Sequence, residues 1–140
     1  MKKNIKIILA VILVIGLGAG YYGYKEFNRE HKDTSSLTVN EKIDAIALVN
    51  AFEADETVAN KKFLNKVIQV TGKLQSAEKD KDGIITVYLE SESMMATVSC
   101  QLEKDKNYTL ESFTKGNSIT ITGLCSGYLT DVVLMRCVVN

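Results

Sequence analysis

Three cysteines are the residues of this sequence best suited to chemistry, and they stand at positions 100, 125 and 137. All three fall on the predicted inward face of a strand, so the plainest interpretation is that Cys100, Cys125 and Cys137 pack as small hydrophobic side chains. A disulfide is the rival interpretation, because Cys125 and Cys137 flank a predicted turn near Thr130 and Asp131. Both states stay open at this point.

Metal and catalytic signatures are missing from the sequence. There is no CxxC motif, and the only histidine, His31, lies outside the predicted folded part, so no zinc site is predicted. No glycine-rich phosphate loop is present, and no serine or cysteine stands beside a plausible base. We therefore predict a protein that is not an enzyme, has no catalytic residues and uses no cofactor.

Alternating apolar and polar residues predict five strands. The first runs from Val67 to Leu74, and Gly72 inside it marks a bend or a close backbone approach. The other four are Ile84 to Glu90, Met95 to Leu102, Ile119 to Leu124 and Asp131 to Val139. The strand from Ile119 repeats the rhythm of the first, with Gly123 in the equivalent place, so the two are predicted to be neighbours.

In the last strand, one set of alternating residues is predicted to face inward. Val133, Met135, Cys137 and Val139 share the phase opposite Arg136.

Helices and turns are predicted between and before these strands. Asn40 can cap a helical segment from about Glu41 to Leu64, either one kinked helix or two short ones. The Asp-Gly end of the run 78–83 is a hairpin signal. Tyr108 to Phe113 can form a short helix that plugs one end of a barrel.

Three strands, a short helix and two more strands follow the order of an OB-fold, a small five-stranded barrel. The stretches AFEADETVANKKFLNKVIQVTGKL, Cys100-Gln101-Leu102, KGNSITITGLCSGYL and DVVLMRC also resemble the tRNA_anti-like family of bacterial OB-fold proteins. The resemblance covers about Ile43 to Asn140. It implies a mainly β chain: a five-stranded OB-fold barrel preceded by an α-helical segment. The family is known mostly from predicted envelope proteins and lipoproteins, so the resemblance indicates fold rather than chemistry. Because the third and fifth strands of an OB barrel are neighbours, Cys100 with Cys137 is an alternative disulfide.

The first 24 residues predict a membrane-targeting segment. Three lysines precede an uncharged run of 18 residues from Ile7 to Tyr24, which is at the lower edge of a bilayer span. Three tyrosines at its end suit a membrane interface, whereas Gly18 and Gly20 offer a signal-peptide cleavage pattern. We expect an uncleaved transmembrane anchor, with a cleaved signal peptide as the alternative. The sequence lacks the lipobox cysteine that lipoprotein relatives carry, which favours a helical anchor.

Length and composition leave room for one folded domain beyond that segment. With 46% hydrophobic and 24% charged residues, the 140-residue chain is ordinary globular material once its N-terminus is set aside. We predict an anchor at 1–24, a juxtamembrane spacer at 25–39 and an OB-fold domain with its N-terminal helix at 40–140. The domain is expected on the extracytoplasmic side of the membrane.

Polar residues predicted to face outward on the second and third strands are the candidate ligand-binding residues: Thr86, Tyr88, Thr97, Ser99 and Gln101. OB-folds commonly bind ligands on this face, although an ordinary solvent-facing strand has similar residues. From Lys66 onward, eight basic and nine acidic side chains give a net charge of −1, which is not the basic footprint of a nucleic-acid binder. We predict a membrane-tethered, non-catalytic binding module that contacts an envelope protein or glycan. A single-stranded nucleic-acid binder is the alternative.

Overall fold

The computed structural model describes residues 15, 16, 18–22, 24, 38–104 and 106–140. The chain divides into two units, Met1–Lys32 and Asp33–Asn140. Within the described residues, no helix is both long enough and apolar enough to cross a membrane. Most of the predicted anchor and spacer lies outside the described residues, so the anchor, its cleavage and the boundaries at 24 and 39 stay predictions.

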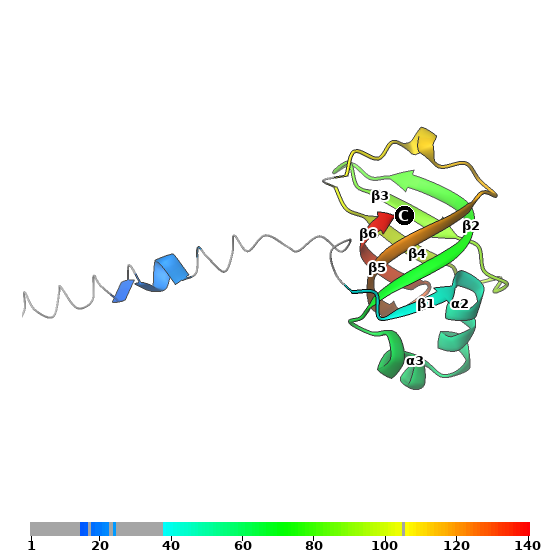
Figure 1. Ribbon diagram of the computed structural model, residues 1–140, viewed down its shortest axis with the longest axis horizontal. Helices are drawn as coiled ribbons and strands as arrows, with labels where there is room; N and C mark the ends of the chain where they lie inside the picture. The colour runs from blue at the N-terminus through cyan, green and yellow to red at the C-terminus, as the bar shows by residue number, and fades with distance from the viewer. Residues whose placement is uncertain (1–14, 17, 23, 25–37, 105) are drawn as a thin grey trace, which may run out of the picture. The chain divides into compact units, whose positions relative to one another are not determined.

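Five strands close into a barrel in the second unit (Figure 1). They are β2 (Val67–Lys79), β3 (Ile85–Leu89), β4 (Val98–Leu102), β5 (Ser118–Tyr128) and β6 (Val132–Val139). Neighbours run β2-β3-β4-β6-β5, and pairing of β5 with β2 closes the ring. All neighbours are antiparallel except β4 and β6, which are parallel. This order matches the OB-type barrel expected from the sequence.

The long strand β2 belongs to both halves of the barrel. Its first part, Val67 to Lys73, pairs with β5, and its second part, from Leu74 to Lys79, pairs with β3. The pairing with β3 is irregular between Leu74 and Ser76, and at Gly72, just before this change of partner, a Cβ would lie 2.7 Å from the Cβ of Ala45. A glycine is therefore required at this position, because β2 and α2 approach each other closely there. The prediction that the two glycine-containing strands, now β2 and β5, are neighbours is confirmed.

The segment before β2 differs from the prediction at its start. Residues Glu41–Asp44 form a short strand, β1, which pairs in parallel with the first part of β2. Asn40 is therefore not a helix cap: its side chain accepts a hydrogen bond from the Val67 backbone N–H at 3.2 Å. The cap is Asp44, whose carboxylate accepts from Ile46 N–H at 2.9 Å.

Two short helices follow. This confirms one of the two predicted arrangements, two short helices rather than one kinked helix. Helix α2 (Ala45–Ala54) ends at Asp55, which caps α3 (Glu56–Phe63) by accepting from the Val58 backbone N–H. Phe52 of α2 is buried, with its ring centroid 6.0 Å from that of Phe63 and 5.7 Å from that of Tyr128. These aromatic contacts attach the helices to the barrel, because they bury large apolar rings from three elements together.

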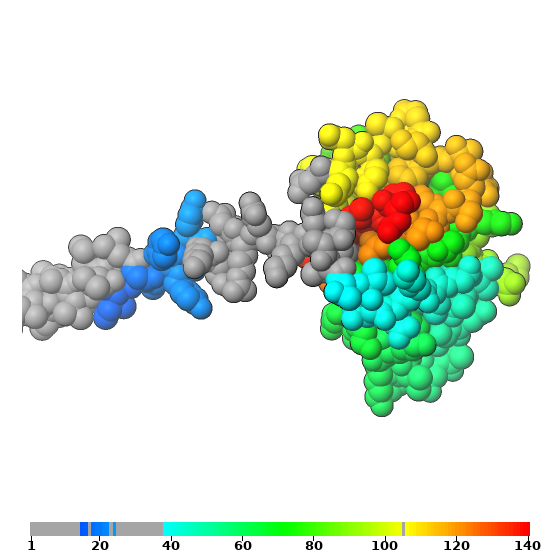
Figure 2. Space-filling view, viewed as in Figure 1, coloured from blue at the N-terminus to red at the C-terminus, as the bar shows by residue number. Residues whose placement is uncertain are grey.

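The predicted helix between β4 and β5 is a single 3-10 turn, η2 (Leu110–Ser112). The Tyr108 and Phe113 rings on either side of it pack at 6.2 Å between centroids. Figure 2 shows the last residues of the chain, in red, at the surface between this yellow segment and the cyan β1–α2 segment. Consistent with that view, the Val139 backbone N–H donates to the Tyr108 hydroxyl oxygen at 3.1 Å.

The predicted inward phase of the last strand is wrong for its first half. Val132 and Leu134 are buried, whereas Val133 is half-buried and Met135 is 40% exposed. The reason is Arg136, whose φ of 54° lies in the left-handed region and interrupts the alternation. After this irregularity the phase switches, so Cys137 is buried as predicted.

Candidate ligand-binding surface

The hairpin of β3 and β4 brings four of the five predicted ligand-binding residues together. Thr86 pairs with Gln101 and Tyr88 pairs with Ser99, so the four side chains form two adjacent rows on the outer face. All four are half-buried, while their strand neighbours point into the core. The face offers two hydroxyls, one amide and one phenol, which can donate and accept hydrogen bonds.

Thr97, the fifth predicted residue, is held by the fold. It lies just before β4, and both its backbone N–H and its hydroxyl donate to Oδ1 of Asp131, at 2.7 and 2.9 Å. Asp131 belongs to the turn between β5 and β6, so this contact fixes that turn beside the β3–β4 connection. Thr97 thus borders the face, and its hydroxyl proton is donated to Asp131 rather than available to a ligand.

Acidic side chains make the surroundings of Tyr88 unfavourable for a negative charge. The pKa of Tyr88 is raised, first by burial and then by the nearby carboxylates of Glu78 and Asp131. Both effects disfavour the negative phenolate. A ligand here would meet a neutral phenol in surroundings that repel anions.

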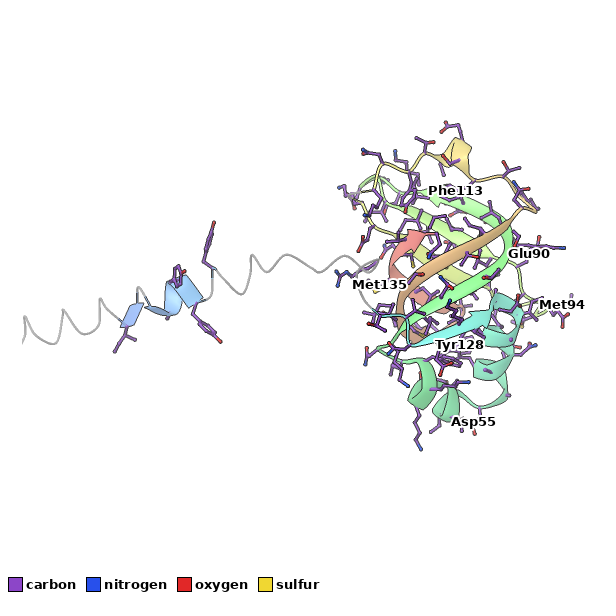
Figure 3. The ribbon with its side chains drawn as sticks, viewed as in Figure 1. Asp55, Glu90, Met94, Phe113, Tyr128 and Met135 are labelled. Carbon is purple, nitrogen blue, oxygen red and sulfur yellow. The ribbon has the colours of Figure 1, made fainter. Side chains whose placement is uncertain are left out.

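Exposed methionines lie in the connection between β3 and β4. Met94 and Met95 are almost fully exposed, and Figure 3 shows Met94 extending away from the body of the domain. Methionine side chains are flexible and polarizable, which suits adaptable apolar contacts.

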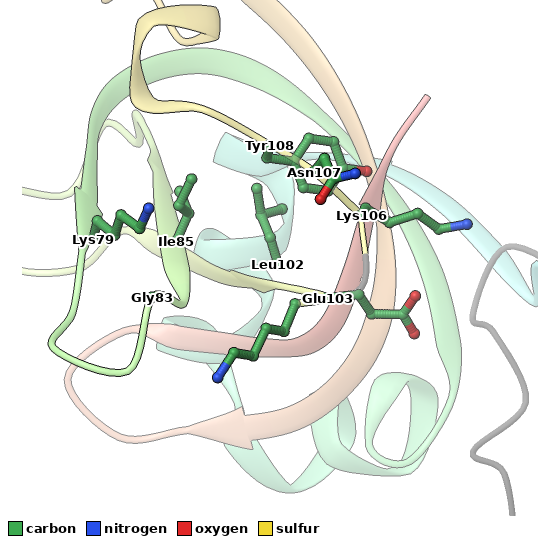
Figure 4. A pocket seen from close by; sticks show the side chains of 9 residues that line it. Lys79, Gly83, Ile85, Leu102, Glu103, Lys106, Asn107 and Tyr108 are labelled. Atoms are coloured by element: carbon green, nitrogen blue, oxygen red, sulfur yellow. The ribbon is translucent and has the colours of Figure 1, made fainter.

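A cleft lies at one end of the barrel, between the β2–β3 turn and the segment after β4 (Figure 4). Its volume is about 220 Å³. The lining residues are Lys79, Gly83, Ile85, Leu102, Glu103, Lys104, Lys106, Asn107 and Tyr108.

The sequence did not single out the residues of this cleft as functional. Six of the nine come from the run 78–83, predicted as a turn, and from the charged segment 103–107, and the other three are Ile85, Leu102 and Tyr108. The order of the strands could have indicated this cleft. Because β3 pairs with its neighbours β2 and β4 in antiparallel fashion, the turn after β2 and the segment after β4 lie at the same end of the barrel, and lysines from both line the cleft.

The three cysteines are buried free thiols in the structure. Burial raises the pKa of Cys125, and raises that of Cys137 well above its usual range, where a hydrogen bond with Cys100 adds to the effect. Cys137 faces Gly123, since a Cβ on Gly123 would lie 2.5 Å from its sulfur. The Cys125–Cys137 bridge stays a prediction, and this arrangement favours the alternative partner, Cys100.

No metal-binding cluster occurs within residues 38–104 and 106–140 or the few described residues before them. No group there brings together three or more His, Cys, Asp or Glu side chains that could hold an ion.

Comparisons with known proteins identify the family. No curated protein matches the chain. A crystal structure from Klebsiella pneumoniae, described as a "putative nucleic acid-binding lipoprotein", is similar at a TM-score of 0.58 and 16% sequence identity, over 80% of this chain and 99% of that one. That likeness shows a shared fold. The model of the tRNA_anti-like family matches residues 1–139, and the chain therefore belongs to the tRNA_anti-like family.

Proposed function

We propose that the protein is a non-catalytic binding module whose β3–β4 face contacts another protein or a glycan of the cell envelope. The observation that carries the proposal is the in-register pairing of Thr86 with Gln101 and of Tyr88 with Ser99. It gathers hydrogen-bonding groups around one aromatic ring on a rigid pair of strands. Such a surface suits peptide or sugar hydroxyl groups, which need directional partners and a flat apolar surface.

Charge and apolar exposure support a protein or glycan ligand on this face. The carboxylates of Glu78 and Asp131 act on Tyr88, so a neutral or cationic ligand is favoured over an anionic one. The exposed Met94 and Met95 at the border add the apolar contact area that protein partners use.

An envelope location is part of the proposal. It is supported by the export-type character of residues 1–24 in the sequence and by the description of the structural neighbour as a lipoprotein. Anchoring through an uncleaved helix, with the domain on the extracytoplasmic side, remains our expectation. The intact mass of protein purified from membranes tests it, because cleavage near Gly20 would remove the segment.

Site-specific photo-crosslinking tests the binding face. A photoreactive phenylalanine analogue at Tyr88 should give discrete adducts in intact envelopes, and Ser99→Arg in the same chain should abolish them by filling the face. The control position is Lys42, which is exposed on β1. Identical adducts from both positions, or none from Tyr88, would contradict the proposal.

Single-stranded nucleic-acid binding is the second candidate function. The observation that favours it is the lysine-lined cleft. Lys79 ends β2 and pairs with Ile85 at the start of the strand that carries Tyr88, and Lys104 follows the strand that carries Ser99. A base could stack on an aromatic ring while a lysine contacts phosphate. The description of the structural neighbour is compatible with this candidate.

Fluorescence anisotropy with a labelled oligothymidine decides on that candidate. Binding through phosphate contacts should weaken steeply when salt is raised, and Lys79→Gln should reduce the slope. Absence of binding at low ionic strength would remove nucleic acid from consideration.

A further inference from the structure

Lysines are the commonest described residues lining the cleft at the barrel end. Among the residues of the lining that the structure describes, three are lysines, Lys79 at the end of β2 and Lys104 and Lys106 after β4, and one is acidic, Glu103. The Glu103 carboxylate lies 3.9 Å from Nε of Arg136, and Figure 4 shows this carboxylate directed away from the cleft. In the described lining, basic side chains therefore outnumber acidic ones.

One acidic residue of the adjoining turn, Asp80, is bonded to the turn's own backbone. One carboxylate oxygen of Asp80 accepts from the N–H groups of Asp82 and Ile84, at 2.9 and 2.8 Å. This contact organises the turn and directs that carboxylate oxygen toward the turn's own backbone. Gly83 completes the turn with a φ of 83°, a conformation that side-chain-bearing residues rarely adopt.

The floor of the cleft is apolar and held in place. Ile85 and Leu102 are buried residues whose side chains rise toward the cleft in Figure 4. The Tyr108 ring forms a wall, and its position is fixed because its hydroxyl accepts from Val139 N–H while its ring packs against Phe113. A ligand would therefore meet ammonium groups at the rim and a rigid apolar surface beneath them.

We propose that this cleft binds a phosphate monoester carried on a sugar or polyol. Lys79 and Lys104 contact the phosphate, and the sugar carbons pack against Leu102 and Tyr108. Lysine ammonium groups bind phosphate as compact point charges, whereas a carboxylate is better matched by the planar fork of arginine. The volume of about 220 Å³ is below that of a drug-sized pocket and suits one small head group. This site is separate from the β3–β4 face and does not depend on the function proposed for that face.

Titration of ¹⁵N-labelled protein with glucose 6-phosphate tests the proposal. At about 10 mM probe, tenfold above the Kd of a weak specific site, amide signals of Gly83, Leu102 and Asn107 should shift together. Lys79→Gln and Lys104→Gln should each weaken binding by roughly three- to tenfold, because each removes one charge-assisted contact. Lys61→Gln, on the exposed surface of α3, is the matched control and should have no effect.

Further probes separate the sources of phosphate and the outcomes that overturn the proposal. If vesicles containing phosphatidylglycerol bind and Lys79→Gln or Lys104→Gln weakens that binding, the proposal is supported with a lipid head group as the source of the phosphate. If glucose 6-phosphate binds and the vesicles do not, the proposal is supported with a free sugar phosphate as the ligand. Equal shifts with glucose, or no shifts with glucose 6-phosphate, would overturn it. Tighter, lysine-dependent binding of an eight-residue oligothymidine would overturn it in favour of nucleic acid.

Discussion

Gly72 of β2 lies directly beneath Ala45, the first residue of α2. A Cβ at Gly72 would stand 2.7 Å from the Cβ of Ala45 and 3.4 Å from that of Leu89. Gly72→Ala should therefore lower the free energy of unfolding by about 1–3 kcal/mol, because α2 must move to relieve the overlap. Urea unfolding measures the change. Ser76→Ala, exposed on the same strand, is the control, and a Gly72→Ala chain as stable as that control would contradict the prediction.

The carboxylates beside Tyr88 should be detectable in its titration. Asp131→Asn and Glu78→Gln each remove a negative charge that raises the Tyr88 pKa, so each should lower that pKa. The decrease will be partial, because burial is the largest cause and remains. The ring-carbon chemical shift of Tyr88, followed by NMR against pH, gives the value, and an unchanged titration in both variants would refute the proposed effect of the two carboxylates.

Buried thiols should make the reduced protein less stable in alkali. The pKa values of Cys125 and Cys137 are raised in the folded state, so the unfolded chain loses its thiol protons first. The contribution of these thiols to the free energy of unfolding is complete below the unfolded pKa of about 8.5. It is lost as the pH rises toward the pKa values of the folded state, by up to about 1.4 kcal/mol per pH unit for each thiol. Urea unfolding at pH 8 and pH 10 under reducing conditions measures the loss. Cys125→Ala should show a smaller loss than the wild type, and an equal loss would count against this account.

Thiol counting on unfolded, non-reduced protein determines the state of the cysteines. One free thiol indicates a bridge and three indicate none. Cys137 faces Gly123 of β5, and Gly123 is two residues from Cys125, which is roughly 6.6 Å along the strand. The Cα atoms of Cys137 and Cys125 are therefore separated both by this offset and by the spacing of about 5 Å between neighbouring strands. On β4, Cys137 pairs with Leu102, which is likewise two residues from Cys100, and Cα atoms more than about 7 Å apart cannot be bridged without backbone movement. The hydrogen bond between the Cys137 and Cys100 side chains is what distinguishes the two pairs, so any bridge should join Cys100 to Cys137.

Mass mapping of the linked peptides distinguishes the two pairings. A Cys100–Cys137 bridge closes a longer loop than Cys125–Cys137, so the chain-entropy estimate is roughly 4 kcal/mol rather than roughly 3. Reduction should lower the melting temperature accordingly. Recovery of a peptide linking Cys125 to Cys137 would show that the hairpin opens to accommodate the shorter bridge.

The sequence predicted the barrel well where a single periodicity dominates. In β3 and β4, strict alternation placed Val87 and Cys100 inside and Tyr88 and Ser99 outside, and the structure agrees. Each of these strands is flanked on both sides by hydrogen-bonded neighbours, so its register is determined by which face is apolar.

Two local features escaped sequence reasoning because the deciding interactions are long-range. The segment from Glu41 has helical character in its pattern, but its backbone pairs with Ile68 and the residues after it, so tertiary pairing overrides the local preference. In β6, the left-handed conformation occurs at Arg136, a residue type that does not indicate it in a sequence. The prediction of inward-facing residues by simple alternation was therefore wrong for the first half of this strand.

The candidate site was predictable only in part for the same reason. Outward positions on β3 and β4 follow from alternation, whereas the cleft requires knowing that two loops meet at one end of the barrel. The contact of Thr97 with Asp131 likewise joins residues 34 positions apart, and no local pattern indicates it.

The pairing of β1 with β2 determines where the folding unit must begin. Residues Glu41–Asp44 cover the backbone of β2 from Ile68 to Thr71 on the side opposite β5. A chain shortened to start at Ala45 would keep every barrel strand yet leave that stretch of β2 without a hydrogen-bonded neighbour on the side that β1 covers. Exposed strand backbone of this kind recruits strands from other molecules, so the shortened chain should aggregate during expression although its core residues are all present.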